Sequence, residues 1–387
     1  MNAKARQHIP FFRPSIGANE IDAALGVLRS GWLTTGPKCA EFEQKFAEHL
    51  GSGVYAISVN SATAGIHLAA EACGIGPGDA VLVPTLTFTA TAAAFRHVGA
   101  EVILVDVNKD DLTIDLTDAE RKITSGCVAI VPVHFAGWPC DMKAILAFAQ
   151  RHGLKVIEDA AHALPAHRDG RPIGSWDSDA CVFSFYANKT ITTGEGGMVT
   201  TVHPEIAARV RTMRTHGFDR DTFKRYNTTG ASWLYDIIAP GFKYNLTDVA
   251  AAIGIAQLTR VHVFQAQRQR IAKLYSKLLA DLPLDCPLSA PVGSLHAWHL
   301  YPIRVHPEAS KRRNEIIDHL SRSGIGTSVH YRPLHRMTYW QRQCATQPDA
   351  FPNADQYFEG ALTLPLYPDM RKQEVERVSA VLHEVLE

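Results

Sequence analysis

The chain has no cysteine pair at the spacing of a disulfide framework or a zinc site. Its seven cysteines are odd in number and widely scattered, and no two of them are separated by only two residues. Disulfide frameworks use an even set of cysteines, and structural zinc sites use closely spaced pairs. We therefore expect neither feature, and we predict a reducing, cytoplasmic location.

The chain also lacks an excess of charge and a long apolar run. Lys plus Arg and Asp plus Glu both number 39, so no broad electrostatic field favours nucleic acid or an anionic membrane as a partner. No stretch of eighteen apolar residues occurs, and residues 1–10 contain no apolar signal core. We predict neither a membrane span nor an export signal, and we expect any bound anion to be held by local groups.

Histidines are plentiful but lack a metal-binding pattern. None of His134, His162, His167 and His330 belongs to a His-Glu-x-x-His motif, although the chain has eighteen histidines. Scattered histidines of this kind usually lie on the surface or in the core with satisfied hydrogen bonds. We therefore predict no metal site.

What the chain does have is an alternation typical of α/β proteins. Its 387 residues suggest two domains, and 46% hydrophobic residues suit a large core. Between about residues 54 and 200, Val/Ile-rich runs alternate with Ala/Leu-rich helical stretches, which predicts a mainly parallel sheet covered on both faces. The strand-like runs are 81–84, 101–106, 128–133 and 155–159, and the helical stretches are 63–73, 89–97 and 142–152.

The pattern changes after residue 250. A long helical stretch over 248–279 precedes a strand-like run at 298–305 and two further helical segments. We predict a large domain over 1–250 and a smaller C-terminal α/β domain over 251–387. The irregular segment 214–240 is predicted to be a mobile lid or a dimer arm.

Lys189 and Asp159 form the chemically most informative pair. A pyridoxal phosphate site needs a lysine amine to hold the aldehyde as a Schiff base and a carboxylate to keep the pyridine nitrogen protonated. Taken singly, a lysine is usually a surface charge, and an Asp at a strand end is often a helix cap. Phe88, Asp159 and Ser184 each follow a strand-like run, which places all three at the edge of the sheet where ligands bind.

Seven segments in order carry a family resemblance. They resemble the sugar aminotransferases of the DegT/DnrJ/EryC1/StrS group, members of the fold-type I pyridoxal phosphate superfamily. The segments are 31–37, 60–65, 84–91, 158–163, 183–197, 240–248 and 324–331.

The resemblance implies a fold, a cofactor and a set of contacts. The fold is aspartate aminotransferase-like, with a mainly parallel seven-stranded sheet, and the cofactor is pyridoxal 5'-phosphate. Lys189 and Asp159 are the catalytic pair, His162 lies near the phenolic oxygen of the ring, and Phe88 stacks on the ring face. The resemblance places Ala62, Thr63 and Ser184 at the cofactor phosphate; without it, a Ser or Thr at a helix start would be read as a cap.

The resemblance also implies a homodimer with shared active sites. In the family, the segment equivalent to 241–248 reaches the cofactor phosphate of the neighbouring subunit. Many members have Asn where this chain has Lys243, Arg where it has Asn245, and His where it has Tyr186. Both Lys243 and Asn245 are therefore predicted cofactor contacts, with the choice between them open.

The implied reaction is transamination of a nucleotide-linked sugar. The amino group comes from an amino acid, with L-glutamate expected, and a 4-keto sugar becomes a 4-amino-4-deoxy sugar for a lipopolysaccharide or an antibiotic. Thr35, His330 and Tyr331 are the predicted substrate contacts, although a His-Tyr pair in a strand-like run is as often ordinary packing. The alternatives are C3 amination, an aminohydroxybenzoate synthase-like reaction, and a non-catalytic regulator.

Overall fold

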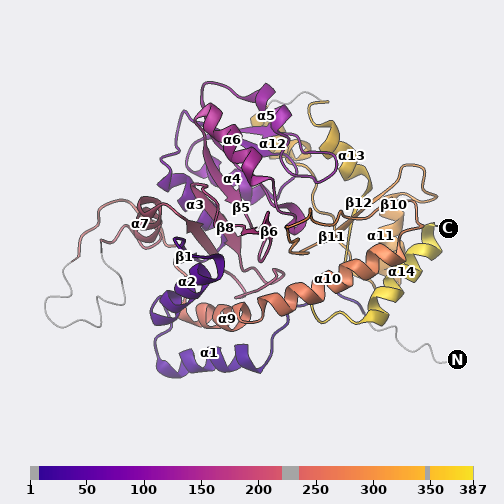
Figure 1. Cartoon of the computed structure of the whole chain (residues 1–387), viewed down its shortest axis with the longest axis horizontal. Coiled ribbons are helices and arrows are strands. Elements are labelled where there is room, and N and C mark those ends of the chain that lie inside the picture. Colours follow the sequence, from indigo (N-terminus) through magenta and orange to yellow (C-terminus); the bar gives the residue numbers. More distant parts are fainter. Residues whose placement is uncertain (1–7, 220–234, 345–348, 387) are drawn as a thin grey trace.

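A seven-stranded sheet forms the centre of the computed structural model, which describes residues 8–219, 235–344 and 349–386 (Figure 1). The strand order is β1-β9-β8-β5-β4-β2-β3. The five strands from β8 to β3 pair in parallel, and β9 is antiparallel to both of its neighbours, so the predicted mainly parallel sheet is confirmed. The strands are β1 (Tyr55–Val59), β2 (Ala80–Pro84), β3 (Glu101–Val105), β4 (Cys127–Ile130), β5 (Lys155–Asp159), β8 (Ala180–Ser184) and β9 (Gly197–Thr201).

Helices cover both faces of the sheet. Alternate residues of a strand point to opposite faces, and here both sets are apolar and need cover from water. Val81 and Val83 belong to one apolar core and Leu82, between them, belongs to the other. The first core is closed by α3 (Ala62–Ala72), α4 (Thr89–His97) and α7 (Pro204–Met213). The second is closed by α2 (Pro37–Leu50), α5 (Leu116–Lys122), α6 (Met142–His152) and α9 (Asp248–Leu258).

Most elements of the α/β stretch agree with the sequence pattern. The predicted helices 89–97 and 142–152 are α4 and α6 with the same bounds. The run 128–133 departs from the prediction, since β4 ends at Ile130. Pro132 has no amide hydrogen to continue the ladder, and only an isolated bridge joins Val133 to Asp159.

The predicted long helix over 248–279 is wrong, because two helices occupy it. The first, α9, ends at Leu258, and α10 (Val261–Leu278) begins after a two-residue break. The Thr259 hydroxyl donates to the Ala256 carbonyl (2.7 Å), and Arg260 is held by Glu20 (3.2 Å), which turns the chain at this point.

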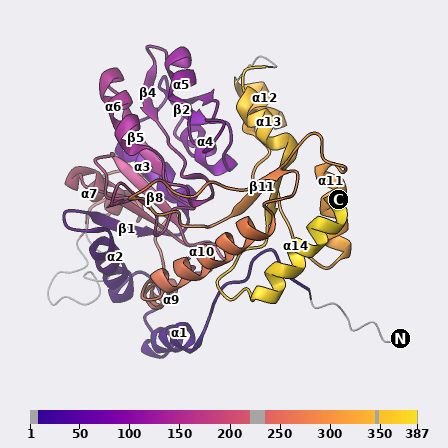
Figure 2. The ribbon, with the colours of Figure 1, turned by 45° about the vertical axis from the view of Figure 1, so that its right-hand side comes forward.

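A third apolar core lies around a small antiparallel sheet (Figure 2). This sheet contains β10 (Leu284–Asp285), β11 (Tyr301–Val305) and β12 (Ala361–Leu364), and the far half of α10 packs on it with α11 (Arg313–Arg322) and α14 (Lys372–Leu386). The predicted run 298–305 is strand only from Tyr301, since Trp298 adopts a positive φ of 52°. Between β11 and β12, α12 (Thr338–Cys344) and α13 (Pro352–Gly360) return to the first core.

The N-terminal segment contacts two of these cores. Ile9 lies in the third core and forms a parallel bridge with Ile325, whereas α1 (Ala18–Ser30) packs against α9. The division of the chain at residue 250 stays a prediction.

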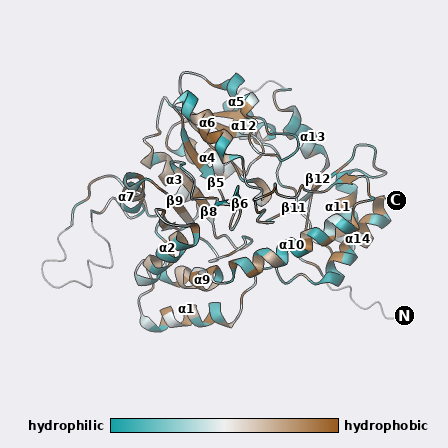
Figure 3. Cartoon of the chain, in the orientation of Figure 1, coloured by the Kyte–Doolittle hydropathy of each residue, from teal (hydrophilic) through white to brown (hydrophobic). Residues whose placement is uncertain are grey.

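The remaining elements are short, and the hydropathy of the chain follows its burial. Figure 3 shows apolar residues in the central strands and polar residues on the outward faces of the surrounding helices.

In the described part of the chain, no helix is long and apolar enough to cross a membrane. Residues 220–234 of the predicted lid or arm lie outside the described residues. The short elements are β6 (His167–Arg168), β7 (Arg171–Pro172), η1 (Phe135–Gly137) and η2 (Leu334–Arg336).

Candidate active site

A cavity of about 420 Å³ lies at the carboxyl ends of β5 and β8. These strands are parallel neighbours, so Asp159 at the end of β5 and Ser184 at the end of β8 reach the same edge of the sheet. Nine of the predicted site residues line this one cavity, namely Ala62, Thr63, Phe88, Asp159, His162, Ser184, Lys189, His330 and Tyr331.

Two backbones approach each other closely at Ala62, one of the residues that line the cavity. Gly197 pairs with Ser184 on one side and with Val59 on the other. A Cβ atom at Gly197 would lie 2.8 Å from the Ala62 nitrogen, which no real side chain tolerates. Glycine at this position therefore lets β9 pass directly beneath the start of α3.

Lys189 lines the cavity as a desolvated amine. Burial lowers the pKa of this amine from its ordinary value to about 8, although the nearby carboxylate of Asp159 opposes the shift. At pH 7 about a tenth of the amine is thus neutral, far more than for a lysine of ordinary pKa. A neutral amine has the free electron pair that attack on an aldehyde requires.

Asp159 is fixed by donors on both of its oxygens. The hydroxyl of Thr91 donates to Oδ2 (2.6 Å), and the Ala161 amide donates to Oδ1 (3.0 Å). The hydroxyl of Thr87 lies 2.7 Å from that of Thr91. Sequence reasoning missed both threonines: they lie within the segment 84–91, but nothing in the pattern shows that Thr91 faces β5.

His162 is a neutral hydrogen-bond donor. Burial, and next the positive charge of Lys189, lower the pKa of its ring well below the ordinary value. Its Nδ1 accepts the Ala136 amide hydrogen (3.2 Å), so the ring proton is on Nε2 and faces the hydroxyl of Tyr331 (3.2 Å). The tyrosine ring in turn lies 6.0 Å from that of Phe88.

The predicted strand around His330 and Tyr331 is wrong. Ser328 makes the last bridge to Thr363 of β12, and the two residues follow in irregular chain. This departure from the sheet brings both side chains to the cavity. His330 is held there by a 2.9 Å hydrogen bond between its Nδ1 and the Thr363 hydroxyl.

The start of α3 provides anion-binding groups. Ser61 caps the helix by accepting the Ala64 amide (3.1 Å), whereas the first amides of a helix have no partner within it. Ala62 and Thr63 occupy these positions at the cavity wall, with Ser184 across from them. Amides at the positive end of a helix, two hydroxyls, a carboxylate and a lysine of lowered pKa together fit a phosphorylated pyridine aldehyde.

Three predicted site residues lie apart from this cavity. Asn245 donates to the Thr35 hydroxyl (2.7 Å), which donates to the Leu246 carbonyl (2.6 Å), and the Lys243 ammonium contacts Asn245. None of Thr35, Lys243 and Asn245 lines the Lys189 cavity of the same chain.

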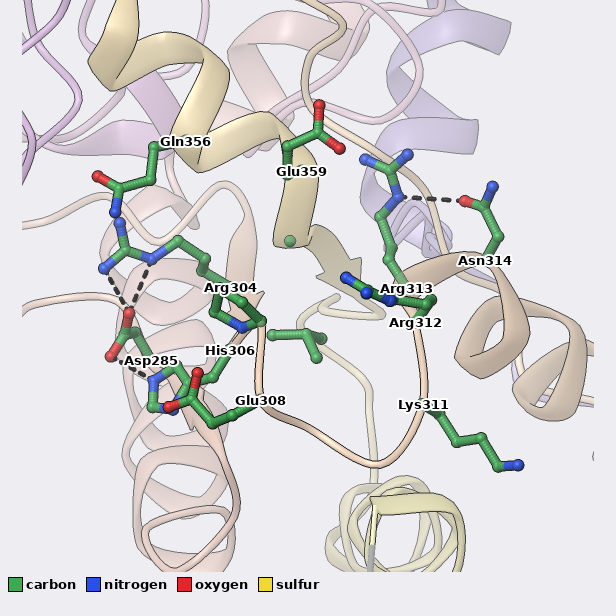
Figure 4. Close-up of a pocket in the computed structure, with 13 residues that line it drawn as sticks. Asp285, Arg304, His306, Glu308, Lys311, Arg312, Arg313, Asn314, Gln356 and Glu359 are labelled. Atoms are coloured by element: carbon green, nitrogen blue, oxygen red, sulfur yellow. Dashed lines mark hydrogen bonds and ion pairs between the residues drawn. The ribbon is translucent and has the colours of Figure 1, made fainter.

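A second hollow, of about 430 Å³, does not offer comparable chemistry. It lies among β10, β11, α11 and α13, and Figure 4 shows Arg304 and His306 both directed at Asp285 (2.7 and 2.9 Å). Its one lysine, Lys311, is exposed. Over 8–219, 235–344 and 349–386, no group of three or more His, Cys, Asp or Glu side chains could hold a metal ion.

The sequence is similar to known proteins over nearly its whole length. Residues 14–383 match the DegT/DnrJ/EryC1/StrS aminotransferase family. The spore coat polysaccharide biosynthesis protein SpsC of Bacillus subtilis is 42% identical over 388 residues, covering 100% of this chain and 99% of SpsC.

Solved structures agree. Spr1654 of Streptococcus pneumoniae, assigned as a sugar aminotransferase, is 32% identical in its PLP form, with a TM-score of 0.89 and coverage of 98% of this chain and 100% of that one. PseC of Helicobacter pylori, an aminotransferase involved in the biosynthesis of pseudoaminic acid, is 25% identical, with a TM-score of 0.89 and coverage of 98% and 99%.

Proposed function

Because the chain belongs to the DegT/DnrJ/EryC1/StrS aminotransferase family, we propose that it transfers the amino group of L-glutamate to C4 of a nucleotide-linked 4-keto sugar. It is a pyridoxal phosphate-dependent sugar aminotransferase of fold type I. The observation that carries the proposal is the single cavity in which the desolvated Lys189 and the fixed carboxylate of Asp159 lie beside the start of α3.

Four residues of the cavity have a role in the reaction that we propose. When bound, pyridoxal phosphate supplies an aldehyde for the amino group and a ring that draws electrons from the reacting carbon. Lys189 holds the cofactor at rest and, once released, moves the proton at the donor carbon. Asp159 holds the proton on the ring nitrogen, and His162 lies near the phenolic oxygen. Phe88 covers the ring face.

The lowered pKa of Lys189 gives a pH prediction. The rate at which apo protein captures pyridoxal phosphate should rise with pH through about 8 and then level off, because only the neutral amine attacks the aldehyde. Stopped-flow absorbance from about pH 6 to about pH 12, with Nα-acetyl-lysine as a control for the cofactor's own ionisation, measures the midpoint. A midpoint at the ordinary lysine value of 10.5 would contradict a desolvated amine.

The sugar acceptor is supported by the relatives. SpsC is named for spore coat polysaccharide biosynthesis, and PseC is an aminotransferase involved in the biosynthesis of pseudoaminic acid. These names describe those proteins, and from them we expect a sugar acceptor for this chain as well. The cytoplasmic location expected from the cysteines stays a prediction. Membership of an aminotransferase family, with Lys189 and Asp159 in one cavity, disfavours the non-catalytic regulator.

The position of amination can be read from the product. A panel of nucleotide-linked keto sugars with glutamate as donor should give a product whose nuclear magnetic resonance spectrum places nitrogen at C4. The unconjugated keto sugar should react far more slowly, because the nucleotide supplies binding energy remote from the reacting carbon. Nitrogen at C3, or a cyclic amino ketone as the preferred acceptor, would favour the alternative reactions within the same family.

We also propose a homodimer in which the segment that carries Lys243 and Asn245 completes the cofactor site of the partner, through one or the other of these residues. In one chain neither residue lines the Lys189 cavity, and the Lys243 ammonium contacts Asn245. A Lys189→Ala chain mixed with a Lys243→Ala/Asn245→Ala chain should recover roughly a quarter of wild-type activity, since half of randomly mixed dimers are hybrids with one intact site. A fully active monomer in sedimentation would refute the shared site.

A further inference from the structure

Two buried threonine hydroxyls lead to Asp159 from the start of α4. Thr91 is fully buried and its hydroxyl lies 2.6 Å from Oδ2 of Asp159, itself 7% exposed. Thr87 is 1% exposed, belongs to the cavity lining, and has its hydroxyl 2.7 Å from that of Thr91. A separation of 2.6 Å is typical of a hydroxyl that donates to an ionised carboxylate.

The direction of this chain of hydroxyls is fixed by counting protons. An ionised carboxylate only accepts, so the single hydroxyl proton of Thr91 goes to Asp159. The oxygen of Thr91 then accepts the proton of Thr87. Hydrogen bonds aligned in one direction polarise and strengthen one another where water is excluded.

The two contacts also orient the carboxylate. Thr91 holds Oδ2 and the Ala161 amide holds Oδ1, so rotation of the Asp159 side chain would break a hydrogen bond on either side. The carboxylate nevertheless lines the cavity, where lone pairs not used by these donors face a ligand.

We propose that Thr91, supported by Thr87, is a positioning residue that keeps the carboxylate of Asp159 aimed at the ring nitrogen of the bound cofactor. The proposal rests on the proposed function, because it concerns the same pyridoxal phosphate site. Thr91 touches neither cofactor nor substrate in this assignment. It acts only through the carboxylate, and the hydroxyl, not the methyl group, is the part that acts.

A matched pair of variants separates hydroxyl from packing. Thr91→Val keeps the shape and the methyl group but removes the donor, whereas Thr91→Ser keeps the donor and removes the methyl group. Titration of the full-length apo protein with pyridoxal phosphate should show about tenfold weaker binding for Thr91→Val, since a buried carboxylate loses a partner. Thr91→Ser should bind within about threefold of wild type. The absorbance spectrum of the bound cofactor, which reports the state of its ring, should change in the valine variant only.

Thr87→Val provides the second arm of the test. It leaves the Thr91 contact in place, so binding should weaken by about threefold or less. Thermal unfolding of the apo protein shows whether Thr91→Val folds. If it does not fold, binding of pyridoxal phosphate to Thr87→Val is measured in its place.

The outcomes separate this proposal from the function on which it rests. Wild-type binding and spectrum in Thr91→Val, or a larger defect in Thr91→Ser than in Thr91→Val, would overturn the positioning role while leaving the aminotransferase assignment intact. Failure of the wild-type protein to bind pyridoxal phosphate at all would overturn both.

Discussion

Replacing Lys189 with alanine should reduce transamination by at least about a thousandfold, because the covalent anchor of the cofactor and the group that moves the proton are lost together. The fold should remain, since Lys189 makes its contacts at a cavity wall and not in an apolar core. Initial rates with glutamate and a nucleotide-linked keto sugar measure the loss. Apo thermal unfolding checks the fold.

A chemical readout makes this prediction specific. Borohydride reduction of the wild-type protein should fix the cofactor to the Lys189 peptide, detectable by mass spectrometry, and should fix none in the alanine variant. Lys155→Ala is a suitable control, because Lys155 is an exposed lysine paired with Asp179 (2.8 Å) at the opposite end of β5. An active Lys189→Ala enzyme, or cofactor fixed at another lysine, would refute the assignment.

Replacing Asp159 with asparagine should lower the rate by on the order of a hundredfold or more while retaining cofactor binding. The amide is nearly the same size but carries no negative charge to hold the proton on the ring nitrogen. Its oxygen can still accept from Thr91 or from Ala161, so the side chain should stay in place. The turnover rate at saturating substrate and the cofactor affinity separate the two effects.

Asp141→Asn serves as the matched control for this charge. Asp141 caps α6 through the Ala144 amide (3.1 Å), a role that asparagine fills equally well. Its variant should behave as wild type. Wild-type turnover in Asp159→Asn would mean that another group holds the ring proton.

The sequence predicts the sheet well because burial on both faces leaves a strong pattern. Each central strand contributes residues to two apolar cores, so it appears as an unbroken Val/Ile-rich run that helical stretches separate. The pattern is less reliable where a single group interrupts an apolar run. Pro132 ends a ladder inside a run of apolar residues, and α9 ends at Leu258, before Arg260 leaves helical geometry, with no glycine or proline at the break.

For the site, the sequence indicates the residue types but not their orientation. Lys189 and Asp159 stand out because few other reactions need that pair. The hydrogen-bond partner Thr91 does not stand out in the sequence, because it is far from Asp159 along the chain. Only the pairing of β5 with its neighbours and the packing of α4 bring the two residues together. Lys243 and Asn245 depend on a second chain, which a single sequence does not place.

The contact between the first and last parts of the chain has a consequence for the order of folding. The Ile9 amide donates to the Gly324 carbonyl (2.9 Å), and the Gly326 amide donates to the Ile9 carbonyl (2.8 Å). During synthesis Ile9 leaves the ribosome long before its partners exist, so the third core gains this residue only after Gly326 has been added. The segment around Ile9 is therefore among the last to settle, and its contacts of very high sequence separation make a late, slow step in folding.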